Sequence, residues 1–99
     1  MKISELRNCP EWLREAKTEN ADVSLGEDGC VIWLDGEWLD GEWLGGEWRG
    51  GKWRGGKWRG GVWLDGEWRG GVWLDGKWLG GEWLGGVWRG GEWLGGEWH

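Results

Sequence analysis

Residues 37–53 read EWLDGEWLGGEWRGGKW, and this stretch decides the fold because tryptophan recurs every five residues with a glycine two positions before it. Side chains alternate between faces along a strand, and five residues advance a helix by about 500°, so neither element aligns successive tryptophans. The chain must therefore bend once per repeat. The spacing never slips between Trp33 and Trp98.

The composition predicts a single small domain with the indoles in its core. The 99 residues include 24 glycines and 15 tryptophans but no phenylalanine or tyrosine. The net charge is −6, yet acids and bases are nearly balanced in the repeats, which argues against a nucleic-acid-binding surface. The sequence shows no secretory leader and no apolar run of about 18 residues, so we expect neither signal-peptide secretion nor a membrane span.

Residues 1–30 differ in kind from residues 31–99, and we expect them to form a cap on the array. Residues 3–6 predict a short helix or turn. Residues 9–17 predict a helix, with Pro10 in its first turn and with Trp12, Leu13 and Ala16 on one face. Residues 22–25 and 30–33 predict a hairpin around the turn at 26–29. Cys9 and Cys30 are expected to be free thiols.

A right-handed, four-sided β-solenoid is the favoured fold for residues 31–99. In the order G-E-W-L-D, each Gly and Trp lie two apart and point the same way, so this small–large pair can face inward. The spacing resembles that of the pentapeptide-repeat proteins, whose four-sided coils bury a small and a large apolar residue at this distance. The resemblance implies the same coil, although that family usually carries Ala and Leu or Phe at these positions.

An antiparallel meander of three-residue strands, closed or stacked, is the alternative fold. Asp-Gly and Gly-Gly are strong hairpin-turn signals, and they stand at every junction of the array. Such a meander would have a true period of ten residues, because the two ends of a three-residue strand direct their backbone groups to the same neighbour.

The residue after each tryptophan helps to choose the number of sides. At a spacing of twenty, two columns are pure: Leu44, Leu64 and Leu84, and Arg49, Arg69 and Arg89. At a spacing of fifteen, Leu and Arg mix. The pattern therefore disfavours three sides and leaves a four-sided coil or a ten-residue unit.

The outward residues and the last coil are the candidate interaction sites. We expect the Leu44, Leu64, Leu84 column to contact another copy or a larger assembly. The Arg49, Arg69, Arg89 column is expected to be solvated and balanced by glutamates such as Glu47 and Glu67, with docking to a partner's acids as the alternative. The array stops near Trp98 without an encoded cap, which predicts a homo-oligomer or an assembly component.

Other functions have weaker support in the sequence. Exposed tryptophans could instead be platforms for glycans or choline-like ligands. Catalysis, cofactors and metals are not expected, since the single histidine is the last residue and no nucleotide or metal motif occurs.

The head motif ISELRNCPEWL followed by the W-x-x-G-x array resembles uncharacterised proteins of tailed bacteriophages. The resemblance implies a phage-encoded protein, located in the phage particle or in the cytoplasm of the host cell. It implies a structural or assembly role, with a host-directed effector that binds a host protein as the alternative.

Overall fold

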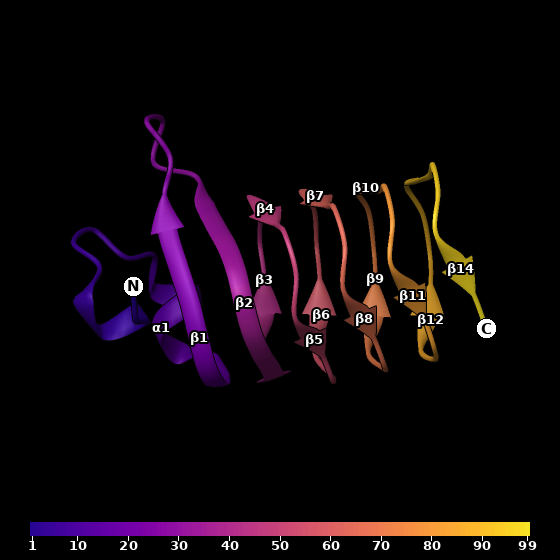
Figure 1. The fold of residues 1–99 in the computed structure, drawn as a ribbon, viewed down its shortest axis with the longest axis horizontal. Coiled ribbons are helices and arrows are strands. Elements are labelled where there is room, and N and C mark those ends of the chain that lie inside the picture. Colours follow the sequence, from indigo (N-terminus) through magenta and orange to yellow (C-terminus); the bar gives the residue numbers. More distant parts are fainter.

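A computed structural model describes residues 1–99 as a β-solenoid with a small N-terminal cap, which confirms the predicted fold class (Figure 1). The cap holds a 3-10 helix η1 (Ile3–Glu5), the helix α1 (Glu11–Glu15) and the strand β1 (Lys17–Leu25). The array begins with the longer strand β2 (Val31–Asp40). Two-residue strands follow: β3 (Glu42–Trp43), β4 (Glu47–Trp48), β5 (Lys52–Trp53), β6 (Lys57–Trp58), β7 (Val62–Trp63), β8 (Glu67–Trp68), β9 (Val72–Trp73), β10 (Lys77–Trp78), β11 (Glu82–Trp83), β12 (Val87–Trp88), β13 (Glu92–Trp93) and β14 (Glu97–Trp98).

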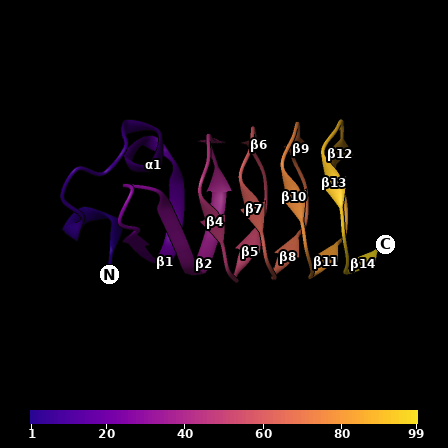
Figure 2. The same cartoon turned by 90° about the horizontal axis from the view of Figure 1, so that it is seen from above.

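The coil has three sides, so the predicted four-sided coil is wrong. Trp48 pairs in parallel with Trp33, fifteen residues earlier, and every later strand likewise pairs with the strand three before it. The parallel register also excludes the antiparallel meander. Because β2 runs along two sides of the first coil, these two sides belong to one sheet, and the third side forms the separate sheet β12-β9-β6-β3. Figure 2 shows the coils following one another along the long axis, with the cap at one end. The right hand of the coil stays a prediction.

Three indoles per coil, one from each side, fill the interior of the three-sided coil. Every repeat tryptophan from Trp33 to Trp83 is at most 1% exposed, as the sequence predicts. Each stacks on the indole fifteen residues further on, with ring centroids 4.6–5.0 Å apart. Each also meets the next indole along the chain edge to face, for example Trp48 and Trp53 at 5.7 Å. Both are favourable geometries for aromatic pairs.

The bend predicted in each repeat occurs at the glycine two residues before each tryptophan. Gly61 has φ +108°, and a Cβ there would lie 2.5 Å from the carbonyl oxygen of Gly46 in the preceding coil. Only glycine therefore combines this backbone conformation with this close approach of the coils. The residue before the glycine is less restricted, and at Asp65 the carboxylate Oδ1 accepts a hydrogen bond from the Gly66 N–H at 2.8 Å.

Backbone hydrogen bonds join neighbouring coils on both sides of each tryptophan. The Arg49 N–H donates to the Trp33 carbonyl at 2.7 Å, and the Lys57 N–H donates to the Gly41 carbonyl at 2.9 Å. The same two bonds recur along the array at 2.7–3.0 Å. Short strands of two residues are thus held by a ladder that continues through every coil.

The cap closes the N-terminal end of the tryptophan core, as predicted. The hairpin is confirmed, since β1 pairs antiparallel with β2. The helix is shorter than residues 9–17, because Ala16 already has an extended backbone that leads into β1. Leu13 is fully buried, and Trp12 packs edge to face on Trp43 with ring centroids 5.1 Å apart. Trp12 thus covers Trp43 at the end of the core, edge to face rather than stacked as the indoles of successive coils are.

Candidate interaction surface

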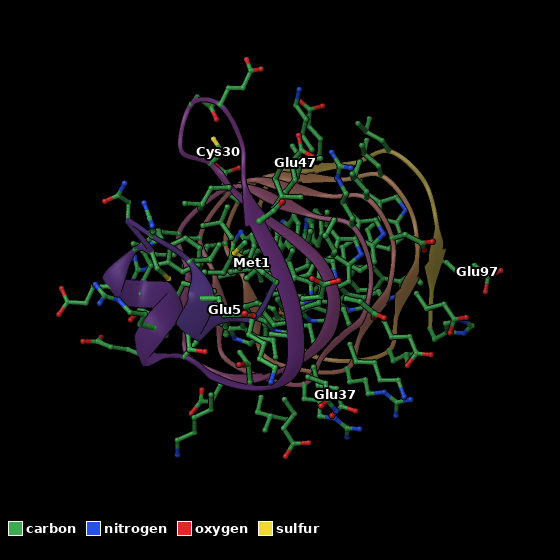
Figure 3. All side chains as sticks on the ribbon, turned by 60° about the vertical axis from the view of Figure 1, so that its left-hand side comes forward. Met1, Glu5, Cys30, Glu37, Glu47 and Glu97 are labelled. Carbon is green, nitrogen blue, oxygen red and sulfur yellow. The ribbon has the colours of Figure 1, made fainter.

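The coil presents three outer faces, and each carries the residues that flank the buried tryptophans. Figure 3 shows glutamates on different strands pointing outward from the coils while the interior is filled with side chains. Face A follows the first half of β2 and the strands β4, β7, β10 and β13; face B follows the second half of β2 and β5, β8, β11 and β14; face C follows β3, β6, β9 and β12.

The two columns read at a spacing of twenty do not exist in the structure. A fifteen-residue coil sends Leu44 to face C, Leu64 to face A and Leu84 to face B. The predicted arginine column is separated in the same way, with one member on each face: Arg49, Arg69 and Arg89. These residues are all on the outside of the coil, but they cannot act together as a stripe.

Face A instead carries a nearly continuous leucine column. Four of the five residues that follow its tryptophans are leucine, interrupted only by Arg49: Leu34, Leu64, Leu79 and Leu94. Leu34 and Leu79 are each 38% exposed, and Leu94 at the last coil is 58% exposed. The signal for this column is present in the sequence at a spacing of fifteen residues, but not at the predicted spacing of twenty.

The arginines pair with glutamates, as the sequence predicts for Arg49 and Arg69. Their guanidinium groups donate to Glu47 at 3.1 Å and to Glu67 at 2.9 Å. Arg54 and Arg59 reach glutamates of the preceding coil instead, namely Glu37 and Glu42. All four pairs are substantially exposed, so each contributes little to stability.

The last coil, residues 85–99 with the strands β12, β13 and β14, carries most of the strongly exposed apolar side chains of the array. Trp98 is 57% exposed, Leu94 is 58% exposed and Val87 is 47% exposed. Trp98 stacks on Trp83 with ring centroids 5.0 Å apart and has no indole on its other face. Trp98 therefore presents one exposed indole face, and its predicted role in an interaction stays a prediction.

Open grooves run along the glycine corners, and no deep pocket interrupts the core. The groove between faces A and B has a volume of about 440 Å³ and is lined by corner glycines with the acidic residues Asp65, Glu67, Glu82 and Glu97. No cluster of three or more His, Cys, Asp or Glu side chains is arranged to hold a metal ion.

The indoles from Trp33 to Trp83 are buried, so the interpretation of the tryptophans as exposed platforms for glycans or choline-like ligands is wrong for these residues.

Ten buried indole N–H groups have no hydrogen-bond acceptor, a feature that sequence reasoning missed. They belong to the tryptophans from the first to the fourth coil: Trp33, Trp38, Trp43, Trp48, Trp53, Trp58, Trp63, Trp68, Trp73 and Trp78. Indole nitrogen is only a donor, and a buried donor without a partner costs stability. No other side-chain polar atom in the chain is buried in this way.

Both cysteines are free thiols, in agreement with the expectation. Cys9 is buried in the cap, and desolvation raises the pKa of its thiol. Cys30 lies exposed in the hairpin turn (Figure 3), where its S–H donates to Asp28 at 3.2 Å. This hydrogen bond and the charge of the Asp28 carboxylate raise the pKa of the Cys30 thiol.

Comparison of the chain with family models, with curated proteins and with solved structures gives no match. The fold and the surface described above therefore rest on the chain's own residues. No helix of the structure has the length and apolar character needed to cross a membrane.

Proposed function

We propose that the chain is a rigid, non-catalytic interaction module and that its last coil binds a second copy of the same chain. The observation that carries the proposal is the concentration of exposed apolar side chains in that coil. Val87, Leu94 and Trp98 are exposed there, while the equivalent indoles of earlier coils are covered by the next layer. Exposed apolar surface of this kind is typical of contact sites.

The cap determines how copies can meet. At the other end of the core, Trp12 and Leu13 already cover the indoles of the first coil. Head-to-tail stacking would therefore join a covered end to an open one, whereas two open ends are alike and both apolar. We expect a closed dimer in which the same surface of each copy meets across a two-fold axis, with no continuing filament.

The size of the last coil limits the strength of this contact. The two shorter dimensions of the molecule are 24 and 18 Å. One end therefore offers roughly 400 Å² per copy, and the pair would bury about 800 Å², below the roughly 1,200 Å² of most specific interfaces. We expect a dissociation constant in the micromolar range or weaker, about −8 kcal/mol or less in magnitude.

Sedimentation equilibrium over a range of concentrations tests the proposal. The parent chain should change from monomer to dimer, and Trp98→Ser should shift this transition to higher concentration. Leu44→Ser is the matched control, because Leu44 is 49% exposed but lies on face C at the capped end of the array. A monomer at all concentrations, or equal weakening by the two substitutions, would show that the last coil is not the contact.

The resemblance to tailed-phage proteins supports a place for this module in a phage assembly. In that setting the dimer would present two rods with their outer faces free for other proteins. Cross-linking of the chain in infected cells and in purified particles, followed by mass spectrometry, separates a particle component from a host-directed effector. Recovery of the chain from purified particles supports the first, and recovery only with host proteins supports the second.

A further inference from the structure

The tryptophan core is a continuous array of aromatic rings in stacked and edge-to-face contact. Column A runs through Trp33, Trp48, Trp63, Trp78 and Trp93, with centroid distances of 4.6–5.0 Å and ring planes within 9° of parallel. The columns on the other two sides have the same spacing, and edge-to-face contacts link the three. Every repeat indole from the first coil to the last therefore contacts at least two others.

We propose that this array carries a one-electron oxidation along the coil, from an indole near an oxidant to the exposed Trp98. Electron transfer between two groups slows exponentially with their separation, so rings in van der Waals contact exchange electrons fastest. Indole is among the most easily oxidised side chains in proteins. The chain contains no tyrosine to compete for the oxidation, and its 15 tryptophans are its only aromatic residues apart from His99.

The unpartnered indole N–H groups keep the oxidation mobile. An indole that loses one electron becomes a radical cation, and its nitrogen then readily gives the proton to water or a nearby acceptor. That loss traps the oxidation as a neutral radical. The ten buried N–H groups from Trp33 to Trp78 have neither an acceptor nor solvent, so the proton stays and only the electron moves.

The surroundings of each indole also accommodate the transient positive charge. An interior ring such as Trp63 has one stacked neighbour on each side, Trp48 and Trp78, whose π faces attract a cation. The outer faces of residues 31–99 carry 11 acidic and 8 basic side chains, a net charge of −3, which favours positive charge in the interior. These two effects oppose the cost of placing charge in an apolar core.

A one-electron oxidant, such as an oxidised metal complex or a radical, takes one electron from an indole beside it and is reduced. Each further step moves one electron from a neutral indole to the neighbouring radical cation, and no bond is formed or broken. At Trp98, which is 57% exposed, the N–H bond breaks and the proton passes to water, leaving a neutral indolyl radical.

A sensitiser attached at the capped end tests the proposal. Cys30 is exposed in the hairpin turn next to the first coil, and Cys9→Ala leaves it as the single thiol. A ruthenium polypyridyl complex coupled to Cys30 is oxidised by a light flash with a soluble electron acceptor, and it then takes an electron from the array. Transient absorption follows the indole radicals, and peptide mass spectrometry locates the oxidised residues.

We expect oxidised product at Trp98, far from the sensitiser, and a radical-cation signal that precedes the neutral radical. Product confined to tryptophans beside the label, such as Trp33 and Trp48, would overturn the proposal. The same complex added free in solution is the control for direct attack. It should oxidise Trp98 whether or not the interior of the array is intact.

A blocking variant, which lacks the indoles of the third coil, tests whether the oxidation passes through the core. Trp63→Phe, Trp68→Phe and Trp73→Phe together replace the indoles of one coil by rings that are much harder to oxidise. The labelled variant should lose the product at Trp98, while free sensitiser still produces it. Unchanged product at Trp98 in the labelled variant would show that the oxidation travels through solvent, and the proposal would fail.

The combined substitutions Trp88→Phe, Trp93→Phe and Trp98→Phe supply a second measurement, should the blocking variant fail to fold, because they remove the less buried indoles and leave Trp33 to Trp83 unchanged. Without these indoles, the radical cation should persist longer and the neutral radical should form more slowly than in the parent. Formation of the neutral radical at the parental rate would mean that interior indoles lose their protons. That result would contradict the role assigned to the unpartnered N–H groups.

Discussion

Adjacent glycines at one corner of the coil should respond oppositely to substitution by alanine. Gly60 and Gly61 form a Gly-Gly junction between the second and third coils. Gly61 has φ +108°, and an added Cβ would meet the Gly46 carbonyl oxygen at 2.5 Å and the Trp43 Nε1 at 3.3 Å. At Gly60 the nearest atom to an added Cβ would be the Leu44 carbonyl oxygen at 3.7 Å, an ordinary contact.

The magnitude follows from two separate costs. Positive φ strains a residue that carries a Cβ by about 1–3 kcal/mol. The overlap with the Gly46 backbone adds about 1–3 kcal/mol, because a carbonyl in the hydrogen-bonded ladder cannot rotate aside as a side chain would. We expect Gly61→Ala to lower the free energy of unfolding by about 4 kcal/mol, and Gly60→Ala to raise it by about 0.4–1 kcal/mol.

Guanidinium unfolding followed by tryptophan emission measures both variants against the parent. In a chain of this length, the loss at Gly61 should also lower the melting temperature by about 15 °C or more. Equal effects of Gly60→Ala and Gly61→Ala would refute the reasoning, because the two positions differ only in φ and in the distance to the preceding coil. A loss at both would mean that the corner as a whole, rather than its second residue, requires glycine.

Two further predictions test the core and the cap. Trp58→Ala should lower the free energy of unfolding by about 3–5 kcal/mol, since it removes a fully buried ring with stacked and edge-to-face partners, and chemical unfolding with refolding checks this value. Asp28→Asn should lower the pKa of the Cys30 thiol, because it removes the carboxylate that raises this pKa. The midpoint of the alkylation rate of Cys30 against pH should therefore move to lower pH, and an unmoved midpoint would exclude the contact with Asp28 in solution.

The local features of the fold could be predicted from the sequence because they depend on nearby residues. An odd repeat excludes a continuous strand or helix, so the coil and the burial of tryptophans such as Trp53 follow from the spacing alone. The hairpin between β1 and β2 follows from alternating residues on either side of a glycine-bounded turn. The sequence places Trp12 on the apolar face of its helix, but its edge-to-face contact with Trp43 could not be predicted, because no periodicity connects it to the array.

The candidate site was predicted less well, because the number of sides was inferred from residues that do not determine it. Leu44 and Arg49 point to solvent, where exposed contacts contribute little, so their order along the chain places weak limits on the coil. The pure Leu and Arg columns at a spacing of twenty do not correspond to any face of the folded coil, because its strands pair at a spacing of fifteen residues. The leucine column of face A and the exposed Val87 appear only when the outer residues are arranged with the correct period.

The packing of the indoles explains why the coil closes after three repeats. Consecutive rings such as Trp63 and Trp68 lie 5.8 Å apart, edge to face. Four rings at this spacing around a square would stand about 8 Å apart across the diagonal, beyond the roughly 4.5–7 Å over which aromatic pairs interact. A channel would then run along the axis, with each ring losing contacts on its inner side, and protein interiors seldom tolerate such voids. With three rings per turn, the same edge-to-face spacing leaves no such channel, so the size of the indole, rather than the residues outside it, selects the fifteen-residue coil.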